Sequence, residues 1–214
     1  MSQSTRVTII GLTILALSSA SSASAENDKA NAIAGAIAVA VTTGVICTTL
    51  AVGDHAEEDR QKPYARRGAM IALGANAAVG PLGESKELAN ASYGLHGRVG
   101  YRCSPRLAGE YEVEWLGGYE PVGGVDLKPL AATSNLRVFV LTGRFQPYVT
   151  LGGGILRVAP DGGSSAIALR AGGGLDFYLT KSIVLNGKLD YVAAFNSLDD
   201  VDYLTLGLAV GYRF

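Results

Sequence analysis

The sequence predicts an all-β protein whose body is an eight-stranded antiparallel up-and-down transmembrane β-barrel, preceded by a signal peptide and a short N-terminal appendage. Three observations support this prediction. From Gly68 onward, apolar residues alternate with small or polar ones at the period of two that strands show. The connections between these segments alternate between long and short. The last segment, Tyr203 to Phe214, ends on an aromatic residue with no polar tail.

Composition narrows the function classes. The 214 residues suit one domain with appendages, and a net charge of -1 gives no electrostatic case for a nucleic-acid partner. Hydrophobic residues make up 48% of the chain, but they are spread through short segments. No metal-ligand spacing and no cofactor motif occurs, and the runs LGGGIL and AGGGLD are interpreted as strand glycines rather than phosphate loops. We therefore expect neither a metal nor a cofactor.

Residues 1–25 are predicted to be a signal peptide. The charged start MSQSTR is followed by the apolar core VTIIGLTILAL and by the small residues SSASSASA. Ala23 and Ala25 form an Ala-x-Ala site, which predicts cleavage after Ala25. The apolar core is shorter than a membrane-spanning helix, so the sequence indicates export rather than anchoring.

Residues 26–67 are predicted to be an N-terminal appendage that ends in a charged linker. The stretch 30–53 is apolar but rich in Ala, Thr and Gly, and it is followed by DHAEEDRQKPYARR. It could be a periplasmic helix, a flexible tether or a second export-like segment. Cys47 lies in this appendage and Cys103 lies in the following region. In an oxidising compartment they could form one disulfide bridge, or they could remain two thiols.

The remaining chain, residues 68–214, is predicted to form the barrel, and its first four strands follow in order. The first places an apolar set on one face: Ile71, Leu73, Ala75 and Ala77. The next two carry charged residues on one face and aromatic or aliphatic residues on the other; the polar set is His96, Arg98, Arg102, Glu110, Glu112 and Glu114. The fourth is apolar on both faces apart from Arg137, so its sidedness stays open. These segments are residues 68–79, 93–102, 107–115 and 135–142.

Four more strands are predicted in the second half. The sixth sets aliphatic residues and Phe177 against Arg170 and Asp176, and the seventh sets Leu185, Leu189 and Tyr191 against Asn186, Lys188 and Asp190. The eighth has an apolar face made of alternate residues and an opposite face of small or polar residues that includes Arg213. These segments are residues 148–158, 167–179, 183–195 and 203–214.

The connections predict which end of the barrel faces outward. The first, third, fifth and seventh are long, whereas the second, fourth and sixth are the short turns CSPR, GRFQP and TKS. Outer-membrane barrels have short periplasmic turns and long outward loops, with aromatic girdles at both membrane surfaces. A soluble lipocalin-like barrel is the alternative, but it explains neither the loop asymmetry nor the terminus.

The final strand resembles the outer-membrane assembly signal, in which a terminal aromatic residue follows apolar residues at alternate positions. The matching residues are Leu206, Leu208, Val210, Tyr212 and Phe214. With the segments GRFQPYVTLGGG, GGGLDFYLTKS and GYRF, the whole of 68–214 resembles the small eight-stranded outer-membrane barrel family. That family includes the OmpA transmembrane domain, OmpX-like proteins and opacity-type porin-family proteins. The resemblance implies a place in the bacterial cell outer membrane, contact with its lipid and with the barrel-assembly machinery, and favours a monomer.

The polar faces predict a charge network inside the barrel. Six cations face five carboxylates: Arg98, Arg102, Arg137, Arg170, Lys188 and Arg213 against Glu110, Glu112, Glu114, Asp176 and Asp190. Buried charges must be paired, so we expect a structural salt-bridge core in which the glutamates pair with Arg98, Arg102 and neighbouring cations. The alternative is a charged constriction in a narrow pore. His96 is expected to hydrogen-bond near Glu112 or Glu114.

These features predict a surface protein without enzymatic activity. Its outward loops would bind host or envelope ligands, or protect the envelope, while salt bridges pack its lumen. Two other functions stay open, namely a small pore or carrier of apolar molecules, and a lipid-modifying enzyme. The deacylase type of barrel uses a His-x-Ser motif, whereas His96 is followed by Gly97 and Arg98.

Overall fold

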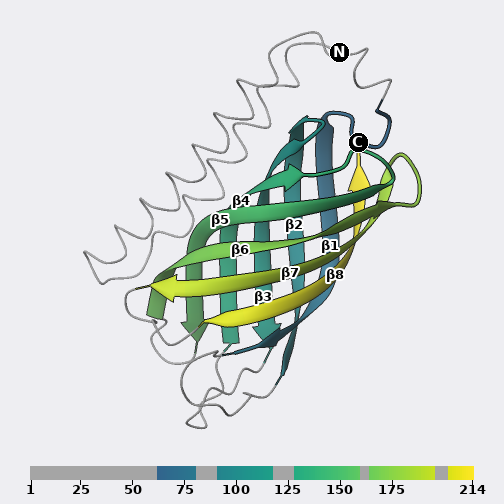
Figure 1. The fold of residues 1–214 in the computed structure, drawn as a ribbon. Helices are drawn as coiled ribbons and strands as arrows, with labels where there is room; N and C mark the ends of the chain where they lie inside the picture. Colours follow the sequence, from purple (N-terminus) through teal and green to yellow (C-terminus); the bar gives the residue numbers. More distant parts are fainter. Residues whose placement is uncertain (1–61, 81–90, 118–127, 160–163, 196–201) are drawn as a thin grey trace.

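The computed structural model describes residues 62–80, 91–117, 128–159, 164–195 and 202–214. Its eight strands form one closed barrel in which each strand pairs antiparallel with the next and β8 pairs with β1 (Figure 1). The strands are β1 Gly68–Val79, β2 Ser92–Ser104, β3 Leu107–Gly117, β4 Lys128–Phe139, β5 Phe145–Ala159, β6 Ser164–Tyr178, β7 Ile183–Phe195 and β8 Tyr203–Arg213. The predicted all-β fold class, a closed eight-stranded antiparallel barrel, is confirmed.

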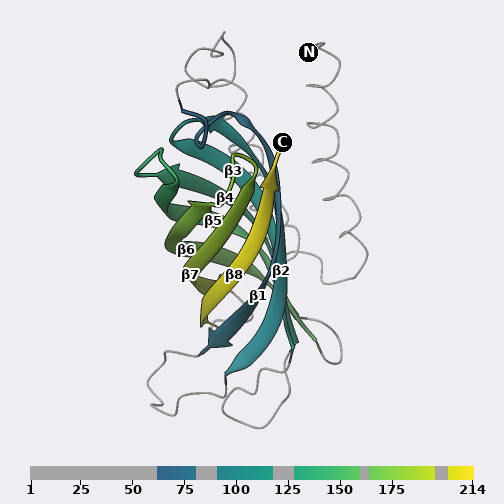
Figure 2. The ribbon, with the colours of Figure 1, turned by 90° about the vertical axis from the view of Figure 1, so that its right-hand side faces the viewer.

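The last strand, β8, closes the barrel by pairing with β1. β8 runs alongside β1 from the pair Met70 and Arg213 to the pair Val79 and Leu204 (Figure 2). The backbone N–H of Phe214 donates to the carbonyl of Ala69 over 3.0 Å. Because β1 satisfies the hydrogen-bonding groups of β8, neither strand leaves an open sheet edge.

The outward face of the barrel is apolar. Large side chains that a water-soluble protein would bury are exposed here, among them Leu73 at 68% and Leu208 at 70%. Exposed aromatic residues stand on this face towards the ends of strands: Tyr93, Trp115, Phe145, Phe177, Tyr212 and Phe214. An apolar band with aromatic residues at its margins is the surface that a transmembrane barrel presents to lipid. The inward face carries the polar and small residues, as the alternation predicts.

The two ends of the barrel differ. Short turns join β2 to β3, β4 to β5 and β6 to β7 at the end where β1 begins and β8 stops. We call this the periplasmic end, because outer-membrane barrels place their short turns there. The other four connections leave from the opposite end, which we call the outer end. Residues 81–90, 118–127, 160–163 and 196–201 of these connections lie outside the described residues.

One strand differs clearly from its predicted bounds. β4 runs from Lys128 to Phe139, whereas the sequence pattern predicts residues 135–142. Residues 128–134 contain Pro129, adjacent alanines and Ser134, a composition with weak strand propensity, and the sequence pattern places them in the long third connection. They form strand because β4 lies between two ladders, in which Leu130 is paired with Trp115 of β3 and with Arg157 of β5. Tertiary pairing therefore overrides local propensity.

Several predictions fall outside the described residues. The signal peptide with Ala23 and Ala25, most of the appendage, and Cys47 all precede residue 62. Among the residues that the structure does describe, no helix is long and apolar enough to cross a membrane.

Candidate functional site in the barrel lumen

The barrel brings the predicted charge network together inside its lumen. Every one of these side chains is at most 3% exposed: His96, Arg98, Arg102, Glu110, Glu112, Glu114, Arg137, Arg170, Asp176, Lys188, Asp190 and Arg213. They come from β2, β3, β4, β6, β7 and β8, and the period-two alternation of each strand points them inward. Small residues on the inward faces leave space for these long side chains. A Cβ at Gly172 would overlap the side chain of Asp190, for example, so only glycine fits beside it.

Arg170 is the hub of the first ion-pair group, which we call the Arg170 cluster: Arg170, Lys188, Glu112, Glu114 and Asp190. Arg170 Nη1 lies 2.8 Å from Glu112 Oε1, 3.2 Å from Asp190 Oδ2 and 3.4 Å from Glu114 Oε2. Lys188 Nζ contacts the same three carboxylates, at 3.3 Å for Glu114, 3.4 Å for Asp190, and in close contact with Glu112. Two cations thus bind three carboxylates from β3 and β7.

A second group, the Arg137 cluster, consists of Arg137, Glu110 and Asp176. Arg137 donates to Glu110 Oε2 at 3.3 Å and to Asp176 Oδ1 at 3.1 Å. Its guanidinium carbon lies 3.5 Å from the centroid of the Tyr148 ring. Asn186 Nδ2 donates to Asp176 Oδ1 at 2.6 Å, so the carboxylate receives hydrogen bonds from two strands. The cluster links the walls formed by β3, β4, β6 and β7.

Of the partners predicted for the glutamates, Arg98 and Arg102 were wrong, whereas pairing with other cations of the network is observed. Arg98 is opposite Glu112 in the ladder between β2 and β3, yet neither Arg98 nor Arg102 makes an ion pair with a glutamate among the described residues. Glu110 instead binds Arg137 on the adjacent strand β4, and Glu112 and Glu114 reach Arg170 on β6 and Lys188 on β7 across the lumen. An eight-stranded barrel is narrow enough for long side chains to meet across its interior, so cross-lumen pairs compete with neighbours on adjacent strands.

Two further residues depart from expectation. Arg102 Nη1 donates to Gln146 Oε1 at 2.6 Å, and its guanidinium carbon lies 3.9 Å from the centroid of the Phe139 ring. His96 was expected to hydrogen-bond near Glu112 or Glu114, but both of its ring nitrogens are buried without a hydrogen-bond partner in the part of the chain that is described. Arg102 therefore links β2 to β5 at the periplasmic end, and His96 is a buried lumen residue.

A short segment that the sequence pattern did not single out lies across the periplasmic mouth. We call Lys62 to Arg67 the strap. The carbonyl of Tyr64 accepts from Arg213 Nη1 at 2.6 Å and from Gln146 Nε2 at 2.9 Å. The Tyr64 ring lies 6.0 Å from the ring of Tyr178, and Ala65 is fully buried. Lumen side chains of β5, β6 and β8 thus hold the strap against the opening.

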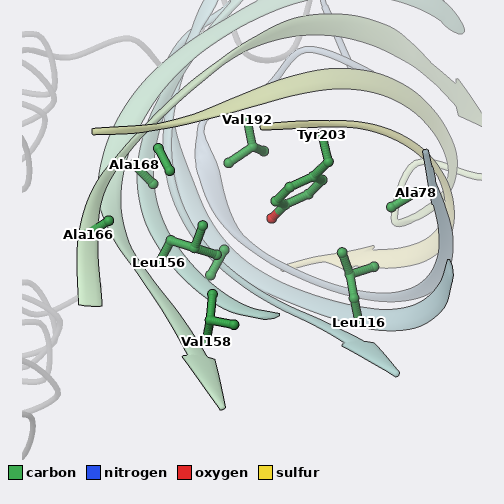
Figure 3. Close-up of a cluster of buried hydrophobic side chains, with 10 residues drawn as sticks. Ala78, Leu116, Leu156, Val158, Ala166, Ala168, Val192 and Tyr203 are labelled. Carbon is green, nitrogen blue, oxygen red and sulfur yellow. The ribbon is translucent and has the colours of Figure 1, made fainter. Parts of the chain in front are cut away.

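The outer end of the lumen is mainly apolar, although Ser92 and Thr205 are also buried there, and the sequence pattern did not predict this. Its buried side chains form one cluster, drawn in Figure 3: Ala78, Leu116, Ala131, Leu156, Val158, Ala166, Ala168, Val192, Ala194 and Tyr203. We call this the apolar cluster. The ring of Tyr203 extends from β8 towards the centre of the barrel. The lumen therefore changes along its axis, from apolar at the outer end to charged in the middle.

The predicted assembly signal lies on the lipid-facing side of β8. Leu206, Leu208, Val210, Tyr212 and Phe214 are all exposed, and the rings of the last two lie 5.0 Å apart, edge to face. Cys103 is fully buried at the periplasmic end of β2. No described cysteine is free, but Cys47 lies outside the described residues, so the bridge between them stays a prediction.

The chemistry available in the lumen is that of paired charges. Within the described ranges, no group of three His, Cys, Asp or Glu side chains is placed to hold a metal ion. The carboxylates bind the guanidinium and ammonium groups instead. Such an arrangement fixes the strands relative to one another and fills the middle of the barrel.

Comparison with known proteins agrees with this architecture. A model of the outer membrane protein beta-barrel domain matches residues 10–214. The chain is similar to the solved structure of Neisserial surface protein A, with 17% identity, a TM-score of 0.57, and coverage of 68% of this chain and 96% of that one. It is also similar to Ail, the attachment invasion locus protein of Yersinia pestis, with 22% identity, a TM-score of 0.50, and coverage of 69% and 99%. The N-terminal β-barrel domain of Pseudomonas aeruginosa OprF gives 17% identity, a TM-score of 0.51, and coverage of 69% and 98%. No curated protein sequence matches the chain.

Proposed function

Because the chain belongs to the outer membrane protein beta-barrel domain family, we propose that it is a non-enzymatic surface protein of the bacterial outer membrane. In this proposal the barrel is a closed anchor, and the outward loops bind a host or envelope ligand. The proposal follows from the lumen: a barrel that is filled in the middle and covered at the periplasmic mouth transports little, so its interactions take place at its outer surface.

The observation that carries the proposal is the pairing of charges across the lumen. The Arg170 cluster joins β3, β6 and β7, and the Arg137 cluster joins β3, β4 and β6. Eight strands leave an interior just wide enough for side chains. The ion pairs therefore occupy the space that a water-filled channel would need, which supports an anchor over a pore.

The position of His96 supports the absence of enzymatic activity. His96 is only 2% exposed and faces the lumen beside the Arg170 cluster, whereas lipid would meet the outward face of the barrel. A general base must lie within hydrogen-bond reach of the proton that it removes. A lipid substrate on the outward face has no such access to His96.

The direct test is the conductance of the purified barrel in planar lipid bilayers. We expect wild-type protein to give no steady current, because the paired side chains fill the channel. The double variant Arg170→Met/Glu112→Gln lacks ion pairs of the Arg170 cluster. It is the positive control, because its lumen should be less tightly packed than that of the wild type. A stable ion-selective current through the wild type would contradict the anchor and favour a small pore.

The loops are tested in cells. Replacing residues 118–127 with a Gly/Ser segment of equal length should abolish adherence of bacteria to host cells or to immobilised envelope components, while the heat-modifiable folded form stays at the wild-type level. A matched variant replaces the short periplasmic turn residues 180–182 and should leave adherence unchanged. Equal adherence of both variants would contradict binding by the outward loops. Mass analysis of lipid A with and without the protein tests the enzymatic alternative, and any modification would contradict the proposal.

A second candidate, a carrier of apolar molecules, is favoured by one observation. The apolar cluster lines the outer end of the lumen, where an apolar molecule arriving from outside would enter (Figure 3). Apolar side chains attract apolar ligands because contact removes apolar surface from water. Titration with a fluorescent fatty-acid analogue would detect such binding. In this candidate, Ala168→Trp fills the outer lumen and abolishes the fluorescence change, whereas Ala132→Trp on the outward face of the same barrel does not.

A further inference from the structure

His96 is a buried lumen side chain that forms no ion pair among the described residues. It is 2% exposed, and neither of its ring nitrogens has a hydrogen-bond partner in that part of the chain. The imidazole is the side chain whose charge ordinarily changes between about pH 5 and about pH 8. We propose that His96 makes the folded barrel acid-sensitive, because a proton on its ring unbalances the charges of the lumen and loosens the Arg170 cluster.

His96 lies beside Lys188. A Cβ on Gly207 of β8 would come within 3.1 Å of His96 Cε1 and 2.7 Å of Lys188 Cε, so both side chains lie over the same glycine. Arg98 follows two residues later on β2 and points into the same lumen. A charged imidazole would therefore stand close to two fixed positive charges. Like charges repel strongly there, because the effective dielectric constant inside a protein is far below that of water.

The charges around His96 and the Arg170 cluster already balance while the imidazole is neutral. Three cations and three carboxylates come from β2, β3, β6 and β7, namely Arg98, Arg170 and Lys188 against Glu112, Glu114 and Asp190. Strand β8 adds the phenol of Tyr203, whereas its Arg213 binds the strap at the periplasmic mouth, and the inward residues of β1 carry no ionisable group. A proton on His96 would add a fourth positive charge to this buried set. Buried charge without a partner of opposite sign is unfavourable.

A charged ring would also compete for Glu114. The ladder between β2 and β3 places Glu114 opposite His96, and this carboxylate binds Arg170 at 3.4 Å and Lys188 at 3.3 Å. A hydrogen bond from protonated His96 to Glu114 would weaken these two contacts, which join β3 to β6 and β7. In the unfolded chain, by contrast, His96 takes up a proton in water near the ordinary histidine pKa of about 6.5. Because the unfolded state then binds the additional proton, stability falls as the pH drops below that value.

The test is urea unfolding of the full-length protein in lipid vesicles at about pH 7.5 and about pH 5, followed by the fluorescence of Trp115. His96 should lower the ratio of folded to unfolded protein by about thirtyfold between these pH values, the effect of a histidine that is charged only after unfolding. Because carboxylates also titrate in acid, this loss is measured as the difference between the wild type and His96→Asn. His55→Gln is the matched control, since the chain has 2 histidines, and this variant should keep the full loss.

Lys188→Met tests whether the acid effect acts through the Arg170 cluster. This variant removes one positive charge beside His96, so a charged ring can take its place among the carboxylates and the loss in acid should shrink severalfold. An unchanged loss would overturn the proposal. A purely structural His96 would alter stability equally at both pH values, so equal pH dependence of the wild type and His96→Asn would overturn it too. His96→Gln keeps this comparison valid if the Asn variant folds poorly. A wild type that gains stability in acid relative to His96→Asn would show that a charged His96 pairs with Glu114, which also contradicts the proposal.

Discussion

Replacing Arg170 by Met should destabilise the barrel more than any other single change in the lumen. The guanidinium is fully buried, and one of its nitrogens binds Glu112, Glu114 and Asp190. Met keeps much of the side-chain volume but removes the charge and the donors. The three carboxylates would then share Lys188 as their only cation in the cluster.

The expected magnitude follows from the cost of uncompensated buried charge. Removing one partner of a buried ion pair typically costs about 3–5 kcal/mol. Three contacts share the Arg170 guanidinium, but contacts in one network are not additive. Lys188 also keeps part of the compensation. We therefore expect a loss of about 5 kcal/mol in the free energy of unfolding, and not three times the value for one pair.

The assay is urea unfolding of the protein refolded in lipid vesicles. Trp115 is the only tryptophan and lies exposed on the outward face of β3, so its fluorescence reports the loss of contact with lipid. Arg157→Met is the matched control, because Arg157 is exposed at the outer end and surface changes usually alter stability by less than about 0.5 kcal/mol. The double variant Arg170→Met/Glu112→Gln should recover part of the loss, since it removes one of the stranded carboxylates.

Two results would refute the reasoning. An Arg170→Met barrel as stable as Arg157→Met would mean that the cluster does not hold the strands together. A double variant that loses the sum of both single losses would mean that Arg170 and Glu112 act independently, despite the 2.8 Å between them.

Three other predictions concern the terminal residue Phe214, the two cysteines and the strap. Deleting Phe214 should lower the heat-modifiable folded form in outer-membrane fractions, because the deletion removes the final exposed aromatic residue and its backbone bond to β1; unchanged folding would contradict the assembly signal. Cys47 and Cys103 should be bridged, so thiol titration under non-reducing conditions should find no free thiol, and two free thiols would disprove the bridge. Tyr64→Ala should lower the free energy of unfolding by about 1 kcal/mol through loss of the ring contact with Tyr178, as measured by urea unfolding; an unchanged midpoint would mean that backbone bonds alone seat the strap.

The barrel itself could be predicted from the sequence because its main signal is local. Alternation with a period of two indicates which residues face lipid and which face the lumen, and this pattern can be identified in each strand separately. Leu206 to Phe214 is the clearest case, since every second residue is exposed. β4 was the exception. Its first half lacks the bulky or β-branched residues that mark a strand, and only its ladders with β3 and β5 establish it.

The contents of the lumen were predictable, but its pairing was not. Charged residues on the inward faces identified Arg170, Lys188 and the glutamates as a buried set. Which cation meets which carboxylate depends on where opposite walls come together, and that follows from the stagger of the closed barrel. No local pattern contains this information. The position of the strap could not be predicted either. Its residues PYARR resemble a linker, and only the hydrogen bonds that they accept from Arg213 place them at the barrel mouth.

The strap has a consequence for the order of events during assembly. Its seat is built from Gln146 on β5, Tyr178 on β6 and Arg213 on β8, whereas the strap itself leads directly into β1. A chain that still lacks β6 and β8 has no binding surface for the strap. A chain in which β1 has not yet paired with β8 cannot place the strap at the periplasmic mouth. Binding of the strap therefore depends on a closed ring, and the strap contacts and the pairing of β8 with β1 stabilise each other.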